Sequence, residues 1–146
     1  MTVIGLDTNI LCYALDPALK EHDILSGLFR DLSPKLIAAL NPTVLLETYH
    51  TLVYHQMWER GETRGRLGIL LRHPHIEFFN QTKHTSFLAM SLAEKYGLGG
   101  RDSLILANFL ANRVTEMQTH DSGVLKLGAV SWKGRKMKLV DPVVSR

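Results

Sequence analysis

Four acidic residues lie at points of the sequence where a carboxylate can do chemistry. Asp7 and Asp121 each come at the end of a short apolar run that is typical of a buried strand. Glu47 lies at the edge of an apolar helical stripe, and Asp102 lies in the first turn of another helical pattern. Taken singly, each carboxylate is also explained as a helix cap, a first-turn acid or a solvated side chain.

Considered together, the four acids indicate a shared location in the fold. Open parallel sheets bind ligands beyond the carboxyl ends of their strands, where the strand order reverses. Asp7 and Asp121 are therefore expected at the same edge of a sheet. Asp102 reaches that edge only if residues 82–112 form two helices, the second beginning near it, and the glycines at 97, 99 and 100 permit such a break.

A cluster of carboxylates needs a counter-charge. Two carboxylates 4 Å apart repel by roughly 4 kcal/mol at an effective dielectric constant of about 20. A hard divalent cation removes this repulsion and prefers oxygen ligands, so the cluster predicts Mg²⁺ or Mn²⁺. The four acids are the expected metal ligands and catalytic residues. Neighbouring polar residues are expected to orient the carboxylates or water, namely Thr8, Asn9 and Thr119.

The charge of the chain points to the class of substrate. The formal net charge is +3, and an acidic pocket in a basic protein favours a polyanion held through a metal ion. The pattern therefore indicates a metal-dependent nuclease. Five residues are candidates for contact with RNA because their side chains neutralise phosphates or stack on bases: Arg101, Trp132, Lys133, Arg135 and Lys136.

Alternation of strand and helix patterns predicts the fold. Strands are expected at residues 2–6, 36–40, 76–80, 115–119 and 138–141, and helices at 10–15, 23–29, from 41–42 onward, 62–72, 82–96 and after 99–100. Such βαβ units give parallel strands joined by right-handed crossovers. We expect a three-layer α/β/α sandwich with a mainly parallel five-stranded sheet, in one domain over residues 1–146.

Composition sets the expected setting of the protein. Hydrophobic residues make up 45% and charged residues 21% of the chain, which is ordinary for a soluble domain. No apolar run has the length of a membrane span, and the chain enters a strand without a signal peptide pattern. The single cysteine, Cys12, offers neither a disulfide nor a metal cluster. A cytoplasmic location and no membrane partner are expected.

At its acidic motifs the chain resembles the PIN-domain ribonucleases, and specifically the VapC-like toxins of type II toxin–antitoxin pairs. The matching segments are Leu6-Asp7-Thr8-Asn9-Ile10-Leu11, Glu47 in the helix opened by Asn41-Pro42-Thr43, Arg101-Asp102-Ser103-Leu104-Ile105 and Thr119-His120-Asp121. The resemblance implies that the four acids share one pocket with Mg²⁺ or Mn²⁺. It also implies hydrolysis of RNA phosphodiester bonds, a homodimer and a cognate antitoxin.

One segment departs from the family pattern. The family often follows its last aspartate with a further acid and an aromatic residue, whereas Ser122, Gly123 and Val124 follow Asp121 here. This departure predicts one strongly bound ion rather than two.

Other readings remain open from the sequence. A PIN-like module that binds RNA or protein without cutting is one alternative, and a small-molecule phosphohydrolase is another. The phosphohydrolase is disfavoured because the chain lacks Asp-x-Asp after its first strand and has no phosphate loop. The Glu47-x-x-His50 spacing would suit a di-iron bundle, but no second copy accompanies it. His73 and His75 read as surface histidines, and His120 reads as a neutral neighbour of the site.

Overall fold

The computed structural model describes residues 1–144 and is built on a six-stranded sheet in the order β3-β2-β1-β4-β6-β5. The strands are β1 (Thr2–Leu6), β2 (Leu36–Leu40), β3 (Ile76–Phe78), β4 (Glu116–Gln118), β5 (Ala129–Trp132) and β6 (Arg135–Val140). The helices are α1 (Thr8–Leu15), α2 (His22–Leu25), α3 (Pro42–Tyr54), α4 (Arg60–Leu71), α5 (Lys83–Tyr96), α6 (Gly100–Ala111) and α7 (Ser122–Leu125).

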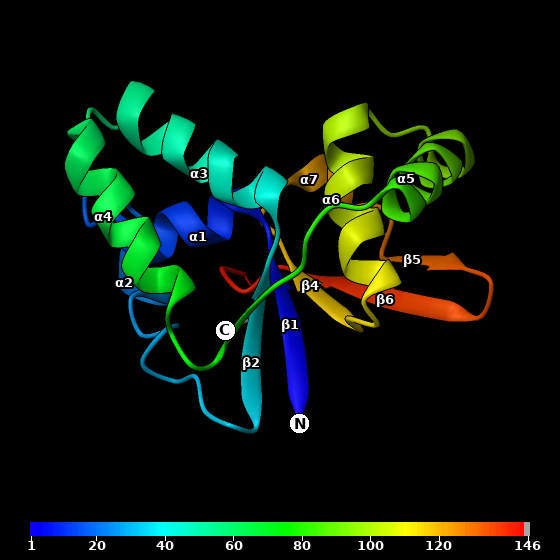
Figure 1. Cartoon of the computed structure of the whole chain (residues 1–146), viewed down its shortest axis with the longest axis horizontal. Coiled ribbons are helices and arrows are strands. Elements are labelled where there is room, and N and C mark those ends of the chain that lie inside the picture. Colours follow the sequence, from blue (N-terminus) through cyan, green and yellow to red (C-terminus); the bar gives the residue numbers. More distant parts are fainter. Residues whose placement is uncertain (145–146) are drawn as a thin grey trace.

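Strand order reverses between β1 and β4. The chain runs outward through β1, β2 and β3 in parallel, and then crosses back to place β4 on the other side of β1. Right-handed crossovers put the helices of these two movements on opposite faces of the sheet. In Figure 1, α1 to α4 lie on the left and α5 and α6 on the right, so the expected three-layer α/β/α sandwich is confirmed.

The prediction of five strands was wrong by one. β5 was missed, and it pairs antiparallel with β6, which itself lies parallel beside β4. The two-residue turn between them has Lys133 at φ 47° and Gly134 at φ 84°. Such turns are usually recognised by Asn-Gly or Asp-Gly, so a lysine at the first position hid the hairpin.

The expected helices are present, and the largest error concerns the second. Residues 23–29 were expected to be helical, but α2 ends at Leu25 and turns follow it. The long crossover after β3 breaks as the sequence permits, because α5 ends at Gly97 in the left-handed conformation at φ 67°. The second helix, α6, then begins at Gly100.

Apolar side chains from both helical layers meet on the sheet. Leu6 and Met117 of the central strands and Phe109 of α6 are at most 1% exposed. They belong to one core cluster that also includes Leu11 of α1 and Val44 of α3. Because α1, α3 and α6 are all anchored in this core, their positions at the carboxyl edge of the sheet are fixed.

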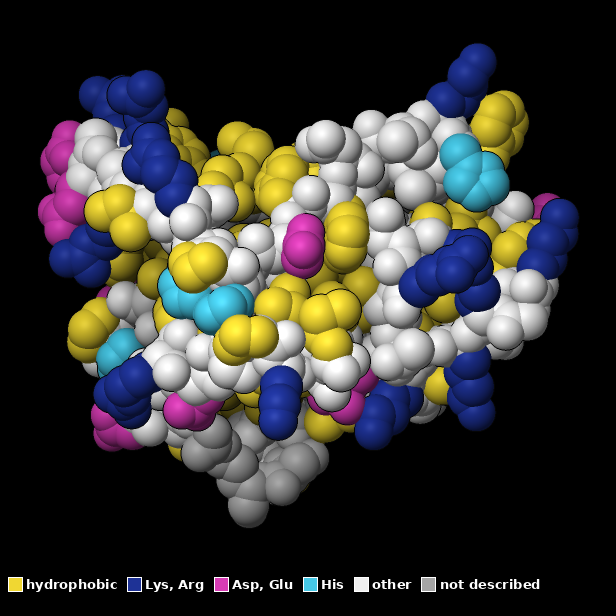
Figure 2. All heavy atoms as spheres, turned by 60° about the horizontal axis from the view of Figure 1, so that its bottom comes forward, with side chains coloured by type: hydrophobic (Ala, Val, Ile, Leu, Met, Phe, Trp, Pro, Cys, Tyr) yellow, Lys and Arg dark blue, Asp and Glu magenta, His cyan; other side chains and the backbone are white. Residues whose placement is uncertain are grey.

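Two surface properties are clear. Over residues 1–144, no helix has both the length and the apolar character that crossing a membrane requires. Figure 2 brings forward the edge where β1 and β2 begin, and on that face Lys and Arg side chains are spread around the rim. This face therefore shows no concentrated basic patch.

Close packing of α6 on β1 predicts the effect of a methyl group at Gly5. A Cβ added there would lie 2.7 Å from Cδ2 of the buried Phe109 ring. Gly5→Ala should therefore lower the free energy of unfolding by about 1–3 kcal/mol, measured by urea denaturation. Gly65→Ala is the matched control because its Cβ meets nothing within 4 Å, and the helical site should gain about 0.4–1 kcal/mol. Equal effects at the two glycines would contradict this account of the packing.

Candidate acidic active site

Asp7 ends β1 and begins α1, which fixes both of its carboxylate oxygens. Its backbone is extended, as an N-cap requires, and Oδ1 accepts a 2.8 Å hydrogen bond from the Thr8 backbone N–H. Oδ2 accepts a 2.7 Å hydrogen bond from the Thr119 hydroxyl, which follows β4. Asp7 is only 8% exposed, so these two donors replace the water that the carboxylate loses on folding.

Thr119 links Asp7 to Asp121. Its Oγ1 donates to Asp7 and also accepts a 3.1 Å hydrogen bond from the Asp121 backbone N–H. The Asp121 side chain caps the short helix α7, since its Oδ1 accepts from the Gly123 N–H at 2.8 Å. One hydroxyl thus connects the two aspartates that follow the central strands.

Glu47 comes from α3, a helix whose start is strongly defined. Asn41 caps it by accepting from the Val44 N–H at 2.9 Å, and Pro42 occupies its first turn. One and a half turns later, Glu47 Oε1 accepts a 3.1 Å hydrogen bond from the Thr8 hydroxyl. The helix start therefore aims Glu47 at the residue that follows Asp7.

Arg101 supplies the positive charge at the mouth of the site. Its Nε lies 2.9 Å from Glu47 Oε2, and its guanidinium lies 3.7 Å from Asp102 Oδ1. The Arg101 side chain is 65% exposed, whereas those of Glu47 and Asp102 are 23% and 30% exposed. The pair closes the pocket weakly, because exposed ion pairs are worth at most about 1 kcal/mol.

All four predicted acids line a single cavity of about 350 Å³. They come from the ends of β1 and β4 and from α3 and α6, and α6 begins near the pocket because the crossover breaks at Gly97. The other residues that line the cavity are Thr8, Asn9, Cys12, Tyr13, Leu19, Thr51, Gln56 and Arg101. The sequence-predicted acids are thus brought together.

Of the three polar residues expected to support the acids, two contact carboxylates directly. Thr8 donates to Glu47, and Thr119 donates to Asp7. Asn9 differs, since its Oδ1 accepts from the His120 backbone N–H at 3.3 Å and so holds the loop after β4 against α1.

Burial shapes the ionisation of the pocket. Burial raises the pKa of Asp7, the hydrogen bonds from Thr119 and Thr8 oppose this rise, and the nearby Asp102 and Glu47 carboxylates add to it. Burial likewise raises the pKa of the Cys12 thiol to about 12, so this thiol is protonated at neutral pH. The Cys12 thiol is therefore not an anionic donor to a ligand in this cavity.

The types of donor atom in the cavity suit a hard cation, but their present positions do not form a complete ligand set. Carboxylate and hydroxyl oxygens are the ligands that Mg²⁺ and Mn²⁺ prefer, and the repulsion felt by Asp7 is what a cation relieves. Among residues 1–144, however, no three His, Cys, Asp or Glu side chains lie close enough together to form a ligand set. Glu47 holds Thr8 and Arg101 instead, so metal binding requires these side chains to rearrange.

Several residues at the site were not predicted from the sequence. Tyr13 and Thr51 line the cavity, and each lies four positions after a predicted site residue, Asn9 and Glu47. Residues four apart on a helix share a face, so this spacing was the available signal. The His120 ring binds Asp141 at 2.8 Å and Tyr13 edge-on at 5.8 Å, a long-range contact that no local pattern announces.

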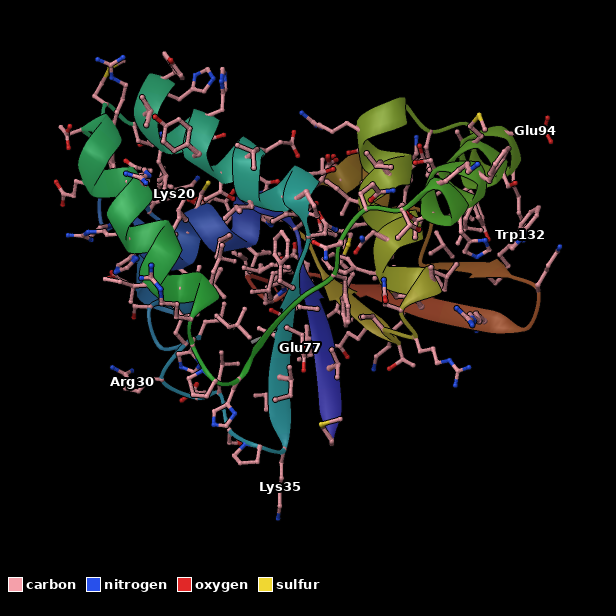
Figure 3. The ribbon with its side chains drawn as sticks, viewed as in Figure 1. Lys20, Arg30, Lys35, Glu77, Glu94 and Trp132 are labelled. Carbon is pink, nitrogen blue, oxygen red and sulfur yellow. The ribbon has the colours of Figure 1, made fainter. Side chains whose placement is uncertain are left out.

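The other RNA-contact candidates lie elsewhere. Arg101 lines the acidic cavity, whereas Trp132, Lys133, Arg135 and Lys136 belong to the β5–β6 hairpin. Figure 3 shows Trp132 beside α5 at the far end of the sheet from Lys20 and α1. The candidates therefore form two separate groups.

The chain matches one protein family and shares its fold with solved structures. The profile of the PIN domain family matches residues 4–129, and no curated protein sequence matches the chain. Mycobacterium tuberculosis VapC20, a Sarcin-Ricin loop cleaving toxin, is similar with a TM-score of 0.71 and 14% identity, covering 89% of this chain and 98% of that one.

Two further structures show the same fold. A chain of VapBC2 from Rickettsia felis, bound to a DNA fragment from their promoter, has a TM-score of 0.59 and 21% identity, over 86% of this chain and 92% of that one. A chain of a toxin–antitoxin complex from Klebsiella pneumoniae has a TM-score of 0.59 and 19% identity, over 95% and 97%.

The raised pKa of Asp7 predicts a pH-dependent effect of Asp7→Asn on the metal-free protein. The unfolded carboxyl ionises near pH 4, but the folded one ionises at a higher pH, so ionisation destabilises the fold as pH rises through that interval. Asp7→Asn removes this cost. Its thermal midpoint in EDTA should exceed that of the wild type at pH 7, and the difference should vanish below about pH 4. A variant that is less stable than the wild type at pH 7 would contradict the prediction.

Proposed function

We propose that this chain, which belongs to the PIN domain family, is a metal-dependent endoribonuclease whose active site is the acidic cavity. The observation that carries the proposal is the convergence of Asp7, Glu47, Asp102 and Asp121 on one cavity from four separate elements. A structural role for each acid would not require them to meet. Their gathering costs free energy, which a substrate-linked cation would recover.

The proposed reaction is hydrolysis of an RNA phosphodiester bond. A bound Mg²⁺ or Mn²⁺ would supply Lewis-acid chemistry, which stabilises charge on phosphate oxygens and lowers the pKa of water. Water loses a proton as its oxygen forms a new bond to phosphorus, the bond from phosphorus to the leaving ribose oxygen breaks, and that oxygen takes up a proton. The four carboxylates are the proposed ligands, directly or through water.

Buried and exposed residues of the cavity have different proposed roles. Asp7 is held by two hydrogen bonds and serves as the fixed ligand, while Thr119 keeps Asp121 in register with it. Asp102 and Arg101 lie at the open side of the cavity, where a substrate phosphate would enter. A guanidinium binds phosphate oxygens with a matching planar geometry, so Arg101 is the proposed phosphate contact.

We further propose that the enzyme is a VapC-like toxin with a cognate antitoxin, that it forms a homodimer, and that residues 1–146 are one catalytic domain. The named structures that share its fold, VapC20, VapBC2 and the Klebsiella complex, support this assignment by fold alone. Exposed apolar side chains on α3 to α5 support protein partners: Leu46, Tyr54, Ile69 and Met90.

A non-catalytic RNA- or protein-binding PIN module is the alternative. Two observations favour it: Ser122, Gly123 and Val124 stand where a further acid is common, and Asp121 already caps α7. In that case RNA would bind without uptake of Mn²⁺ at millimolar concentration.

Calorimetric titration of Mn²⁺ tests the metal site. The wild type should bind, and Asp7→Asn should bind at least about tenfold more weakly because a ligand loses its charge. Thr119→Val, which removes only the hydroxyl that holds Asp7, should weaken binding about 10–100-fold. Glu62→Gln is the matched control, since this acid lies exposed on α4 and pairs with Arg66.

Cleavage of an RNA pool then tests the assignment of roles. Asp7→Asn and Asp121→Asn should abolish Mn²⁺-dependent cleavage, while Glu62→Gln should cleave like the wild type. Folding of each variant is confirmed by circular dichroism. Retention of metal-dependent cleavage by either aspartate variant would overturn the proposed active site.

Substitution of Arg101 is predicted to raise the affinity for Mn²⁺, whereas the substitutions of Asp7 and Thr119 lower it. Since its guanidinium competes for Glu47 Oε2, Arg101→Met should increase Mn²⁺ affinity about two- to fivefold, the equivalent of an exposed ion pair worth about 0.5–1 kcal/mol. The same variant should bind RNA more weakly in EDTA, because the acidic cavity loses its one positive charge and repels phosphates more strongly. Weaker Mn²⁺ binding by Arg101→Met would show that Arg101 positions Glu47 for the metal rather than competing with it.

A further inference from the structure

A second cavity lies at the far end of the sheet, between α5 and the β5–β6 hairpin. It has a volume of about 350 Å³ and is lined by residues that include His84, Phe87, Trp132 and Lys133. An adjoining hollow of about 590 Å³ on the same hairpin shares Trp132 and Lys133 and adds Lys136. Neither hollow shares a lining residue with the acidic cavity.

The hairpin is held firmly against α5. The Tyr96 hydroxyl accepts a 2.9 Å hydrogen bond from the Ser131 backbone N–H, and Lys95 Nζ donates to the Ser131 carbonyl at 2.9 Å. The same ammonium lies 5.8 Å from the centre of the Trp132 ring. Trp132 is therefore a half-buried aromatic surface that is already in place before any ligand arrives.

The cationic side chains of the hairpin fall into two groups, those that already contact other residues and those that form no ion pair among the described residues. Arg135 donates to the carbonyls of Leu110 and Ala111 at the end of α6, and Lys138 pairs with Glu116 at 3.2 Å. Within residues 1–144, Lys133 and Lys136 form no ion pair. Both are exposed, and Lys133 occupies the tip of the turn. These two lysines are available to an anionic ligand.

We propose that the two adjoining hollows on the β5–β6 hairpin, together called the hairpin site, bind one unpaired nucleotide of a single-stranded RNA. The base stacks on Trp132 beside Phe87, and the flanking phosphates contact Lys133 and Lys136. Aromatic side chains interleaved with cations are the pattern that single-stranded nucleic acid uses, since every base has a face to stack and every linkage has a charge. An acidic peptide would use the lysines but would gain little from two aromatic faces.

The proposal deepens the proposed function, because it assumes that RNA is the substrate and names a contact remote from the acids. RNA held at the hairpin would be anchored without being cut there. This site would add affinity for segments that are unpaired, and so would favour single-stranded regions over duplex.

Fluorescence gives a direct test, because Trp58 and Trp132 are the only tryptophans. Trp58→Phe leaves Trp132 as the single indole, and a short single-stranded RNA of mixed sequence is titrated in EDTA so that no cleavage occurs. Stacking should quench Trp132. The reciprocal variant, Trp132→Phe, reports from Trp58, which lies before α4 under Arg66, and should show no quenching.

Salt dependence tests the lysines independently. The double variant Lys133→Ala/Lys136→Ala should reduce the slope of log affinity against log salt by about 1.4, which is about 0.7 for each of two lost phosphate contacts on a single strand. The matched control is Arg30→Ala/Lys35→Ala, which removes two cations that lie away from the hairpin, at the lower left and the bottom of Figure 3. The control should leave the slope unchanged.

The outcomes separate this inference from the nuclease assignment. Absence of quenching, or an equal loss of slope in both double variants, overturns the hairpin site even if the protein cleaves RNA. Quenching with the predicted loss of slope supports the hairpin site even if no Mn²⁺-dependent cleavage is found, and in that case the nuclease assignment fails alone.

Discussion

The Asp7 carboxylate is buried at the carboxyl ends of the two central strands β1 and β4, and the rest of the site depends on keeping it there. Its oxygens are satisfied by one backbone N–H and by Thr119, which reaches across from the end of β4. An unsatisfied carboxylate at this depth would unfold the edge or remain protonated. The Thr119 hydroxyl therefore does more than hold a ligand, since it couples the two strands at which the strand order reverses and brings Asp121 to the same pocket.

The other half of the pocket depends on a broken helix. A single continuous crossover from β3 to β4 would begin at the carboxyl edge and end at the opposite one, with its middle far from Asp7. The left-handed Gly97 ends α5 early, and α6 starts again near the edge with Asp102 in its first turn. There the helix dipole favours a carboxylate, which offsets part of the repulsion from its neighbours. The Phe109 ring, packed against Gly5, then fixes the height of α6 on β1.

Local sequence patterns predicted the features that depend on a few neighbouring residues, namely strand ends and helix starts. Strand ends gave Asp7 and Asp121, and the Asn-Pro helix start gave the helix that carries Glu47, because caps and apolar runs are written within a few residues. The convergence of Glu47 and Asp102 depends on tertiary packing of α3 and α6, which spacing permits without specifying. The same limit hid β5, whose short strand has only Val130 fully buried and whose turn places a lysine at positive φ. The Asp141 contact to His120 escaped for the same reason, since it joins the two segments that follow β4 and β6.

The distribution of charge gives the molecule two unlike ends. At one end, four carboxylates face one exposed guanidinium, so the formal local charge is negative. At the other end, Lys133 and Lys136 extend from a hairpin whose remaining cations are already paired or bound to carbonyls. A polyanion would be repelled by the first end and attracted by the second, since exposed charges act over about a Debye length of 8–10 Å. One divalent ion would reduce the formal charge of the four carboxylates and Arg101 from −3 to −1, so loading it would weaken the repulsion at the acidic end and offer a cation to a phosphate oxygen, while leaving the hairpin as it is.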